Sequence, residues 1–378
     1  MQKQLRVGVV GTGSAGAQHA IVLANLPGVT VVAGADPKNG IELFDEGKQD
    51  SWYIEGSKWY ADESDMLEEE QIDALVLAPD PLSIGSTIKA SVLAQFDERP
   101  TLWERPVGFK PEHTAPVQSI ERGTTFSVVT FNRFGVIEQL RQALQIGDVV
   151  LGDIVSFDAF MSLSIPPFER KPWRWDQLSC QLPIHLLDHI YDTLMYLGLP
   201  QIESVHGVAK YEYLWGRTID RSWAINLRLG NGAVGSINAV QYPQNKEHLM
   251  PLKRLVIIGS EGVIKVSPGE AVFTNNAGEE TKFTQSEMVS NNEFLKKAKD
   301  ELVRFLIERE GYVDTSATHA AAESLVLCDW HWVQNTIGTQ GHEKLSPLGC
   351  LGDSCNCLKI GNAIVESAAK NVEVKVAF

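Results

Sequence analysis

The segment Leu5 to Asp36 constrains the fold of this chain more than any other. It reads LRVGVVGTGSAGAQHAIVLANLPGVTVVAGAD. Its first residues are apolar and often β-branched, which is typical of a strand buried on both faces. The run breaks at the glycine-rich turn GTGSAG, and a helical pattern follows. A strand, a glycine turn and a helix in this order predict the first βαβ unit of a parallel sheet.

Each glycine of this turn has its own physical reason. Gly11 permits a turn too tight for a Cβ, Gly13 lets a pyrophosphate approach the backbone, and Gly16 lets the helix lie close to the strand. The helix N-terminus offers unpaired N–H groups to phosphates. A second apolar strand ends at Asp36, where a carboxylate accepts ribose hydroxyls. The residues predicted to bind a dinucleotide here are Gly11, Thr12, Gly13, Ser14, Ala15, Gly16 and Asp36.

The position of Asp36 also bears on which dinucleotide is bound. A carboxylate favours NAD, because the 2′-phosphate of NADP would meet a like charge. Lys38 stands two residues later and offers a compensating cation. We therefore expect NAD or NADP, with NAD preferred.

Size and charge exclude several classes of function. A chain of 378 residues with 44% hydrophobic and 21% charged residues is typical of a globular protein with two cores. A net charge of −15 argues against nucleic acid or an anionic membrane as the main partner. The sequence has no apolar run of membrane-spanning length, and its first strand leaves no room for a signal peptide. We expect a cytoplasmic protein.

The five cysteines fit that compartment, since an odd number in a long chain is unlike a disulfide framework. Cys350, Cys355 and Cys357 cluster in a stretch that we expect to be a glycine-containing loop. Neither a nearby histidine nor a CxxC pair completes a tetrahedral set, so we predict no metal site there.

The chain changes character near residue 133. Before it, strands alternate with helices, which predicts a doubly wound parallel sheet, with Pro79 and Glu104-Arg105 at strand ends where ligands bind. After it, strands follow one another through short turns such as Gly230-Asn231-Gly232, which indicates antiparallel neighbours with a few helices. We predict a dinucleotide-binding domain over 1–133 and a substrate-binding α+β domain over 134–378.

A second polar constellation lies in the later part. The sequence WRWD is followed by PIHLLDHIYDTLMYLG, which predicts a helix over Pro183 to Leu197. Two histidines and two carboxylates fall on one face of that helix: His185, Asp188, His189 and Asp192. A solvated polar face is one reading, and a zinc site is another, although a third ligand is missing. The sharper hypothesis is that one histidine transfers a proton while a carboxylate orients it.

Six segments together resemble the Gfo/Idh/MocA family, which contains glucose-fructose oxidoreductase and inositol dehydrogenase. They are VGVVGTGSAG, the VxxxADP ending at Pro37, WERP at Trp103 to Pro106, TFNR at Thr130 to Arg133, WRWD with the following HxxxHxxD, and IVESAAKNVEV at Ile364 to Val374. The resemblance implies an N-terminal Rossmann domain, a C-terminal domain with a large, mostly antiparallel open sheet, and hydride exchange between a nicotinamide cofactor and a sugar-like alcohol or ketone.

The resemblance also assigns residues. The family's EKP motif falls on Glu104-Arg105-Pro106, so arginine replaces its lysine. The DxGxHxxD motif falls on His185 to Asp192, which makes His189 the catalytic histidine and Asp192 the acid after it. His185 replaces the first aspartate of that motif, and Leu187 replaces its glycine.

These departures shift the expected chemistry. Arginine keeps its proton up to a pKa above about 12, so Arg105 holds a substrate oxygen or the nicotinamide rather than acting as a base. Proton transfer then falls to His189, with His185 as the second candidate. Pro79, Glu104 and Arg105 are expected beside the cofactor. The residues expected to contact substrate are Asn132, Arg174, Asp176 and Asp188.

We therefore predict an NAD(P)-dependent oxidoreductase of a sugar, cyclitol or similar polyhydroxylated small molecule. Two alternatives stay open: a dinucleotide-binding sensor or assembly subunit without turnover, which the Arg105 replacement favours, and a reductase of a conjugated substrate like the biliverdin reductases. An open sheet buries its uncovered face against another subunit, so we expect a homodimer or homotetramer.

Overall fold

A computed structural model shows two compact units. It describes residues 4–38, 41–44, 52–79, 99–109, 126–165, 181–214, 216–243, 252–284, 287–338 and 348–378. Unit 1 comprises Met1–Phe131, Glu287–Glu310 and Ala322–Ser354, and unit 2 comprises Asn132–Ser286, Gly311–Ala321 and Cys355–Phe378. Each unit is thus assembled from three separate stretches of the chain.

Unit 1 is built on a six-stranded parallel sheet in the order β3-β2-β1-β4-β5-β6. Its strands are β1 Leu5–Val10, β2 Val29–Ala35, β3 Lys58–Tyr60, β4 Ala74–Leu77, β5 Thr101–Trp103 and β6 Phe126–Val128. Residues of β1 and β4 are almost all buried, as a sheet covered on both faces requires. The strand order reverses between β1 and β4, which is where ligands bind in such sheets. The predicted doubly wound parallel sheet is confirmed.

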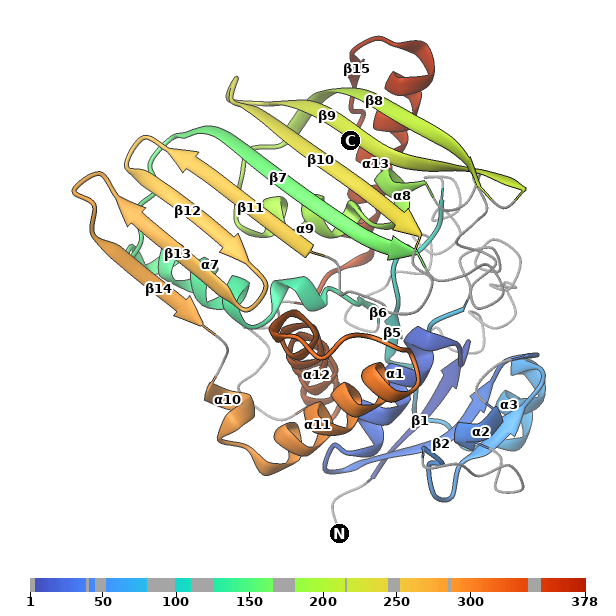
Figure 1. Cartoon of the computed structure of the whole chain (residues 1–378). Coiled ribbons are helices and arrows are strands. Elements are labelled where there is room, and N and C mark those ends of the chain that lie inside the picture. The colour runs from blue at the N-terminus through green and yellow to red at the C-terminus, as the bar shows by residue number, and fades with distance from the viewer. Residues whose placement is uncertain are drawn as a thin grey trace. The chain divides into compact units, whose positions relative to one another are not determined.

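The helices of unit 1 come from both ends of the chain. They are α1 Ser14–Ala24, α2 Ile41–Phe44, α3 Glu63–Glu69, α10 Glu287–Ser290 and α11 Glu293–Glu308. Helix α11 lies alongside α1 (Figure 1). A further helix, α12 Ser316–Thr336, belongs to unit 1 from Ala322 onward. Late segments therefore complete the first domain.

Unit 2 is built on a nine-stranded sheet in the order β14-β13-β12-β11-β7-β10-β9-β8-β15. Its strands are β7 Ile154–Ile165, β8 Ile202–Leu214, β9 Arg217–Leu229, β10 Val234–Pro243, β11 Leu252–Gly259, β12 Gly262–Ser267, β13 Glu270–Asn275, β14 Glu280–Thr284 and β15 Val374–Lys375. Only β7 and β10 pair in parallel, and the other neighbours are antiparallel. The expectation of a large, mostly antiparallel sheet is confirmed.

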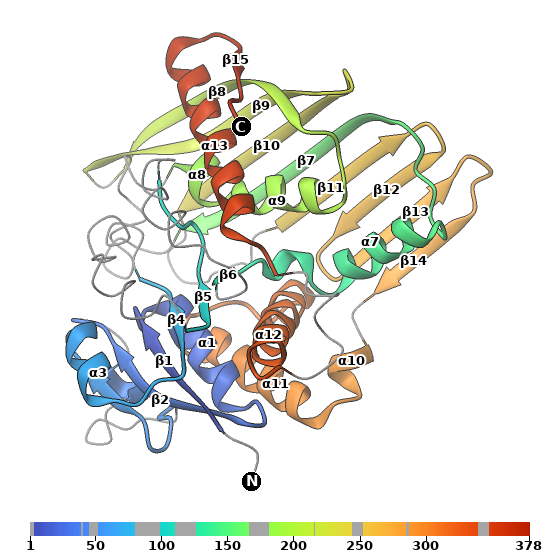
Figure 2. The same cartoon turned by 180° about the vertical axis from the view of Figure 1, so that it is seen from behind.

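Helices cover one face of this sheet. A 3-10 turn, η2 Phe131–Arg133, leads into α7 Val136–Ile146, and the other helices are α8 Leu182–His185, α9 Asp188–Tyr196 and α13 Leu351–Lys370, whose part from Cys355 onward lies in this unit. Figure 2 shows α7, α9 and α13 against that face, and their apolar side chains form one core with the inward residues of the strands. The opposite face carries no helix in the part of the chain that the structure describes.

Two local predictions were wrong. The expected helix over Pro183 to Leu197 is two helices, α8 and α9, with a turn at Leu186 and Leu187. The expected cysteine loop is the first half of α13, in which Cys355 and Cys357 are buried. None of the helices in the described ranges is long and apolar enough to cross a membrane.

Candidate functional site

The glycine turn after β1 leaves no room for a side chain at Gly11. This residue has a φ of +79°, and a Cβ there would lie 2.4 Å from the carbonyl oxygen of Ala78 and 2.5 Å from Cα of Pro79. Both the backbone conformation and the close approach of the β4 strand end therefore require glycine. The turn is held against the strand end at which Pro79 was predicted.

The other two glycines differ in what surrounds them. A Cβ on Gly16 would lie 1.9 Å from the carbonyl oxygen of Gly11, so α1 packs directly on the turn. A Cβ on Gly13 would meet nothing within 4 Å. Gly13 is also the N-cap of α1 and provides no side-chain hydrogen bond to the helix. The turn therefore forms a bare cradle with helix N–H groups at its base, and a pyrophosphate fits it.

Asp36 lies beside this cradle. Its Oδ2 accepts a hydrogen bond from the backbone N–H of Thr12 at 3.1 Å, and its Oδ1 accepts one from the backbone N–H of Lys38 at 2.9 Å. The carboxylate is partly exposed, while Thr12 is buried. The acid predicted to bind ribose thus also holds the backbone of the turn.

Glu310 is a further polar residue near the start of α1, and the sequence analysis did not identify it. The hydroxyl of Ser14 donates to Oε2 of Glu310 at 2.7 Å, and Gln18 donates to the same hydroxyl at 3.3 Å. A carboxylate at a helix N-terminus is favoured by the helix dipole. Glu310 lies almost 300 residues away in sequence, so no local pattern signals this contact.

The strand end at β5 carries Glu104 and Arg105. The backbone N–H of Arg105 donates to Oε2 of Glu104 at 2.8 Å, and Nε of Arg105 donates to the carbonyl of Val129 at 3.0 Å. The Arg105–Pro106 peptide bond is cis. The arginine that replaces the family's lysine is therefore fixed at two points within unit 1.

A buried histidine, which the sequence analysis missed, reaches the same strand end. His19 on α1 has no exposed surface, and its Nδ1 lies 2.8 and 3.0 Å from the two carboxylate oxygens of Asp329. Its Nε2 lies 3.4 Å from Oε1 of Glu104. In the sequence, the only local sign of this residue is that His19 follows Gly16 by three positions. Its main partner, Asp329, lies in α12, far away in sequence.

In unit 2, α8 is fixed at its first residue. The backbone N–H of Leu182 donates to Asp220 at 2.7 Å, and Asp220 also accepts hydrogen bonds from Trp223 and Gln241, each at 2.6 Å. Burial raises the pKa of the Asp220 carboxyl to about 6, although the three donors oppose that shift. A Cβ on Gly361 of α13 would lie 2.6 Å from the carbonyl oxygen of Pro183, so α13 also packs closely on α8.

The two candidate histidines are partly accessible, and the two carboxylates between and after them are buried. Nδ1 of His189 lies 3.9 Å from Oδ1 of Asp188. Asp192 instead accepts two hydrogen bonds from Arg133, from Nε at 2.8 Å and from Nη2 at 2.5 Å. The guanidinium of Arg133 also stacks on the ring of Tyr196, 4.8 Å from its centre. The carboxylate that lies next to His189 is therefore that of Asp188 and not that of Asp192.

Other predicted residues are placed as follows. Oδ1 of Asn132 accepts a hydrogen bond from Nζ of Lys253 at 2.5 Å. Arg174 and Asp176 lie outside the described residues. Across the described part of the chain, no group of three or more His, Cys, Asp or Glu side chains is placed to hold a metal ion.

Comparison with known proteins gives one family match. Residues 137–265 match the family model described as GFO/IDH/MocA C-terminal domain. This part of the chain is therefore similar to the C-terminal domain of that family. The resemblance read from the sequence is confirmed for this domain, and no curated protein matches the sequence significantly.

Solved structures resemble the chain over almost its whole length. An oxidoreductase from Agrobacterium radiobacter, in complex with NAD+, L-tartaric acid and magnesium, covers 99% of this chain and 98% of its own, with a TM-score of 0.73 and 16% identity. The WlbA dehydrogenase from Bordetella pertussis, in complex with NADH and UDP-GlcNAcA, covers 100% and 99%, with a TM-score of 0.68 and 21% identity. A levoglucosan dehydrogenase with NADH and levoglucosan covers 99% and 100%, with a TM-score of 0.71 and 17% identity. At these identities the likeness establishes the shared fold.

Proposed function

We propose that this chain is an NAD(P)-dependent oxidoreductase of a sugar, cyclitol or another polyhydroxylated small molecule. The observation that carries the proposal is the cradle in unit 1. Positions 11 and 16 admit only glycine, while the space beside Gly13 is open and lies at the N-terminus of α1. These features are the ones that binding of a pyrophosphate on the open side of the turn requires.

The cofactor preference follows from Asp36. Its carboxylate stands where the adenosine ribose is bound in such folds, so it accepts from the ribose hydroxyls of NAD and repels the 2′-phosphate of NADP. Lys38 contacts Asp36 through its backbone N–H, and its side chain is exposed. NADH should therefore bind more tightly than NADPH in a fluorescence titration.

The chemical step needs a proton-transferring group on the chain. When bound, a nicotinamide cofactor supplies reversible hydride transfer. We assign the proton of the substrate hydroxyl to His189, whose imidazole is partly accessible and lies beside the Asp188 carboxylate. His185 is the second candidate for this role. Arg105 keeps its charge at all working pH values and holds a substrate oxygen or orients the nicotinamide.

Asp192 acts through the helix that carries His189. Its ion pair with Arg133 anchors α9, because both side chains are buried and joined by two hydrogen bonds. Asn132, Arg174, Asp176 and Asp188 are proposed to bind polar groups of the substrate. The sugar-like ligands named for two of the structural neighbours, levoglucosan and UDP-GlcNAcA, support a polyhydroxylated substrate.

A cofactor-reduction assay tests the proposed activity. Purified protein is mixed with NAD or NADP and a panel of polyols, aldoses, cyclitols and sugar acids, and nicotinamide absorbance is followed. Turnover with at least one class of polyol is expected. Tight NADH binding without any absorbance change across the panel would instead support a dinucleotide-binding subunit without turnover.

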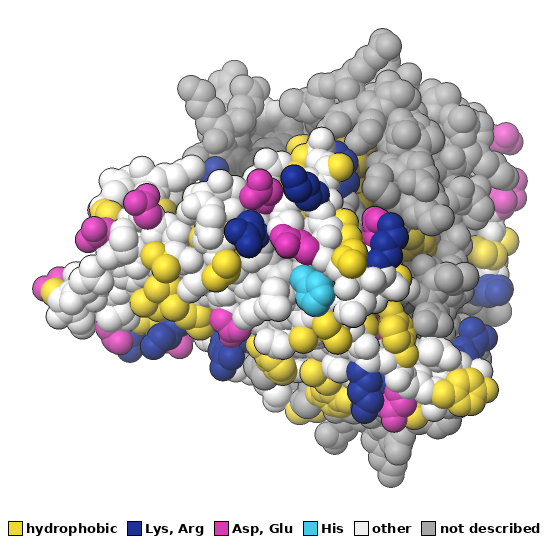
Figure 3. Space-filling view, turned by 90° about the horizontal axis from the view of Figure 1, so that it is seen from above, with side chains coloured by type: hydrophobic (Ala, Val, Ile, Leu, Met, Phe, Trp, Pro, Cys, Tyr) yellow, Lys and Arg dark blue, Asp and Glu magenta, His cyan; other side chains and the backbone are white. Residues whose placement is uncertain are grey.

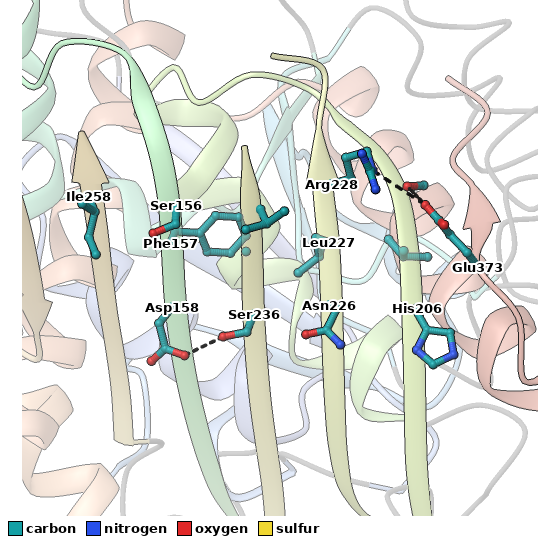
Figure 4. A pocket seen from close by; sticks show the side chains of 14 residues that line it. Ser156, Phe157, Asp158, His206, Asn226, Leu227, Arg228, Ser236, Ile258 and Glu373 are labelled. Carbon is teal, nitrogen blue, oxygen red and sulfur yellow. Dashed lines mark hydrogen bonds and ion pairs between the residues drawn. The ribbon is translucent and has the colours of Figure 1, made fainter. Parts of the chain in front are cut away.

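We also propose that the open face of the nine-stranded sheet binds a second copy of the chain. Strand register places two rows of side chains across this face. One row is Ile258, Ser156, Val234, Arg228 and Ser204, and the next is Val256, Asp158, Ser236, Asn226 and His206. Both rows contribute to a pocket on the sheet surface (Figure 4). Figure 3 shows hydrophobic patches here among acidic and basic side chains and one histidine.

Exposed apolar residues on this face favour a homo-oligomer. Val208, Val234 and Ile258 are 54%, 56% and 40% exposed, although they lie on regular strands. Exposed apolar side chains clustered on one face of a sheet are typical of a subunit interface. Val234→Asp should therefore lower the mass measured by light scattering toward that of one chain. Val150→Asp, at an equally exposed site after α7, is the matched control and should leave the mass unchanged.

A further inference from the structure

Four residues in unit 1 form a continuous line of polar contacts: Asp329, His19, Glu104 and Arg105. His19 bridges the two carboxylates, with Nδ1 at 2.8 Å from Asp329 and Nε2 at 3.4 Å from Glu104. The other oxygen of Glu104 accepts the backbone N–H of Arg105 at 2.8 Å. The four residues come from α12, α1 and the end of β5, so the line connects three elements of one unit.

The charge of each member is set by its surroundings. Burial alone lowers the pKa of His19, but the carboxylates of Asp329 and Glu104 overcome this effect and raise it to about 10. His19 is therefore a cation at neutral pH, and each ring N–H can donate to one carboxylate. Burial raises the pKa of the neighbouring Cys328 thiol well above its usual range, so this side chain adds no charge. The imidazolium and guanidinium balance the two carboxylates.

This arrangement reaches the residue to which we assign substrate or cofactor binding. Glu104 is held on one side by His19, and it holds the backbone of Arg105 on the other. Nε of Arg105 donates to the carbonyl of Val129, the residue that follows β6. His19 also belongs to the helix whose N-terminus forms the phosphate cradle. Movement of His19 would therefore change the position of the strand end relative to that cradle.

We propose that His19 and Asp329 are positioning residues that hold Glu104, and through it the backbone of Arg105, in place for the redox reaction. This inference rests on the proposed dehydrogenase function.

The test uses the full chain with His19→Gln and, as a second variant, Asp329→Asn, which keeps the imidazole and removes one partner. We expect kcat to fall by up to about 10²-fold in His19→Gln, because small displacements of a positioned group have effects of that size. The NADH dissociation constant should change much less. The kcat–pH profile should lose the change that deprotonation of His19 causes in the wild type as the pH approaches 10, because the variant has no imidazolium at this position.

A matched control is available on the surface. His319 and Asp314 form a histidine–carboxylate pair of the same 2.8 Å length, but it is exposed. His319→Gln should leave kcat and its pH profile unchanged. If His19→Gln and Asp329→Asn, both folded by circular dichroism, also keep the wild-type kcat and pH profile, the positioning role is wrong.

A spectroscopic measurement separates this proposal from the proposed activity. Ring-labelled histidine in the wild-type protein should give one NMR signal, absent from His19→Gln, that stays doubly protonated through pH 9. Asp329→Asn should lower the pH at which that signal titrates. A His19 that titrates near its ordinary pKa of 6.5 overturns the ion-pair line even if the enzyme is active. Conversely, if His19 stays doubly protonated but the protein shows no turnover, the proposed reaction is wrong and the contacts from Asp329 to Arg105 remain supported.

Discussion

The glycine turn of unit 1 and the α8–α9 pair of unit 2 hold their polar groups in different ways. In the turn, consecutive residues present backbone N–H groups, and the requirement for glycine at positions 11 and 16 comes from neighbouring backbone atoms. In the helix pair, polar groups are held by side chains far away in sequence: the Asp192 carboxylate by Arg133, and the backbone N–H of Leu182 by Asp220.

That difference separates binding from chemistry. A phosphate cradle is a property of backbone geometry, so it tolerates change in every side chain that points away from it. A proton-transferring histidine depends on where its carboxylate neighbours are paired, and one altered partner changes its environment. Substitutions in the turn should therefore affect cofactor binding, and substitutions in the helix pair should affect turnover and stability.

The largest effect is expected at the histidines of α8 and α9. His189→Ala should lower kcat by about 10²–10⁴, the range typical of a lost acid–base group. His185→Ala is the matched comparison, and its effect should be smaller. Steady-state kinetics with the best polyol of the panel checks both variants, and the reverse order of effects would assign the proton transfer to His185.

The Arg133–Asp192 pair should matter mainly for stability. Arg133→Ala leaves a fully buried carboxylate without its partner, which typically costs about 3–5 kcal/mol in the free energy of unfolding. Urea denaturation followed by circular dichroism measures this loss. The double variant Arg133→Ala with Asp192→Ala should recover part of it, and a single variant as stable as wild type would contradict the structural role of the pair.

Substitution of two glycines of the cradle should separate stability from cofactor binding. Gly16→Ala places a Cβ 1.9 Å from the Gly11 carbonyl oxygen, so it should lower the free energy of unfolding by about 1–3 kcal/mol, as overpacking typically does, and weaken NADH binding. Gly13→Ala meets no protein atom within 4 Å, so it should keep the wild-type melting temperature and weaken NADH binding alone. If Gly13→Ala binds NADH as tightly as the wild type does, the pyrophosphate does not lie on the open side of Gly13.

The smallest effect expected is a change in how stability depends on pH. The pKa of His19 is raised on folding from 6.5 to about 10, so its contribution is fully present below pH 6.5 and is lost as the pH rises toward 10. Unfolding measured at several pH values between 7 and 9 should show a steeper fall for wild type than for His19→Gln, and parallel slopes would contradict a buried imidazolium.

Much of the fold could be predicted because its signals are local. The alternation of apolar runs and helical patterns identified the parallel sheet, and short turns such as Gly230-Asn231-Gly232 identified the antiparallel one. The break at Leu186 and Leu187 was missed because neither residue disrupts helical periodicity. The start of α13 was missed because Gly352 and small polar residues in its first turns are typical of a loop.

The site could be predicted only where function requires particular backbone geometry. Gly11, Gly13, Gly16 and Asp36 have a fixed spacing in the sequence, and the structure brings them together. His19 and Asp329 are 310 residues apart, and a histidine inside an apolar helix gives no sign of its partner. Likewise, nothing near Asp192 in the sequence indicates that Arg133 binds it.

The Asp36 carboxylate has a consequence for protein engineering. It accepts hydrogen bonds from the backbone of both Thr12 and Lys38, so it is a structural support for the cradle as well as the proposed contact for ribose. Replacing it with a small neutral residue, the usual first step toward NADP use, would release the turn at the same time. Redesign of cofactor specificity in this chain therefore needs a second substitution that restores an acceptor for the Thr12 N–H group.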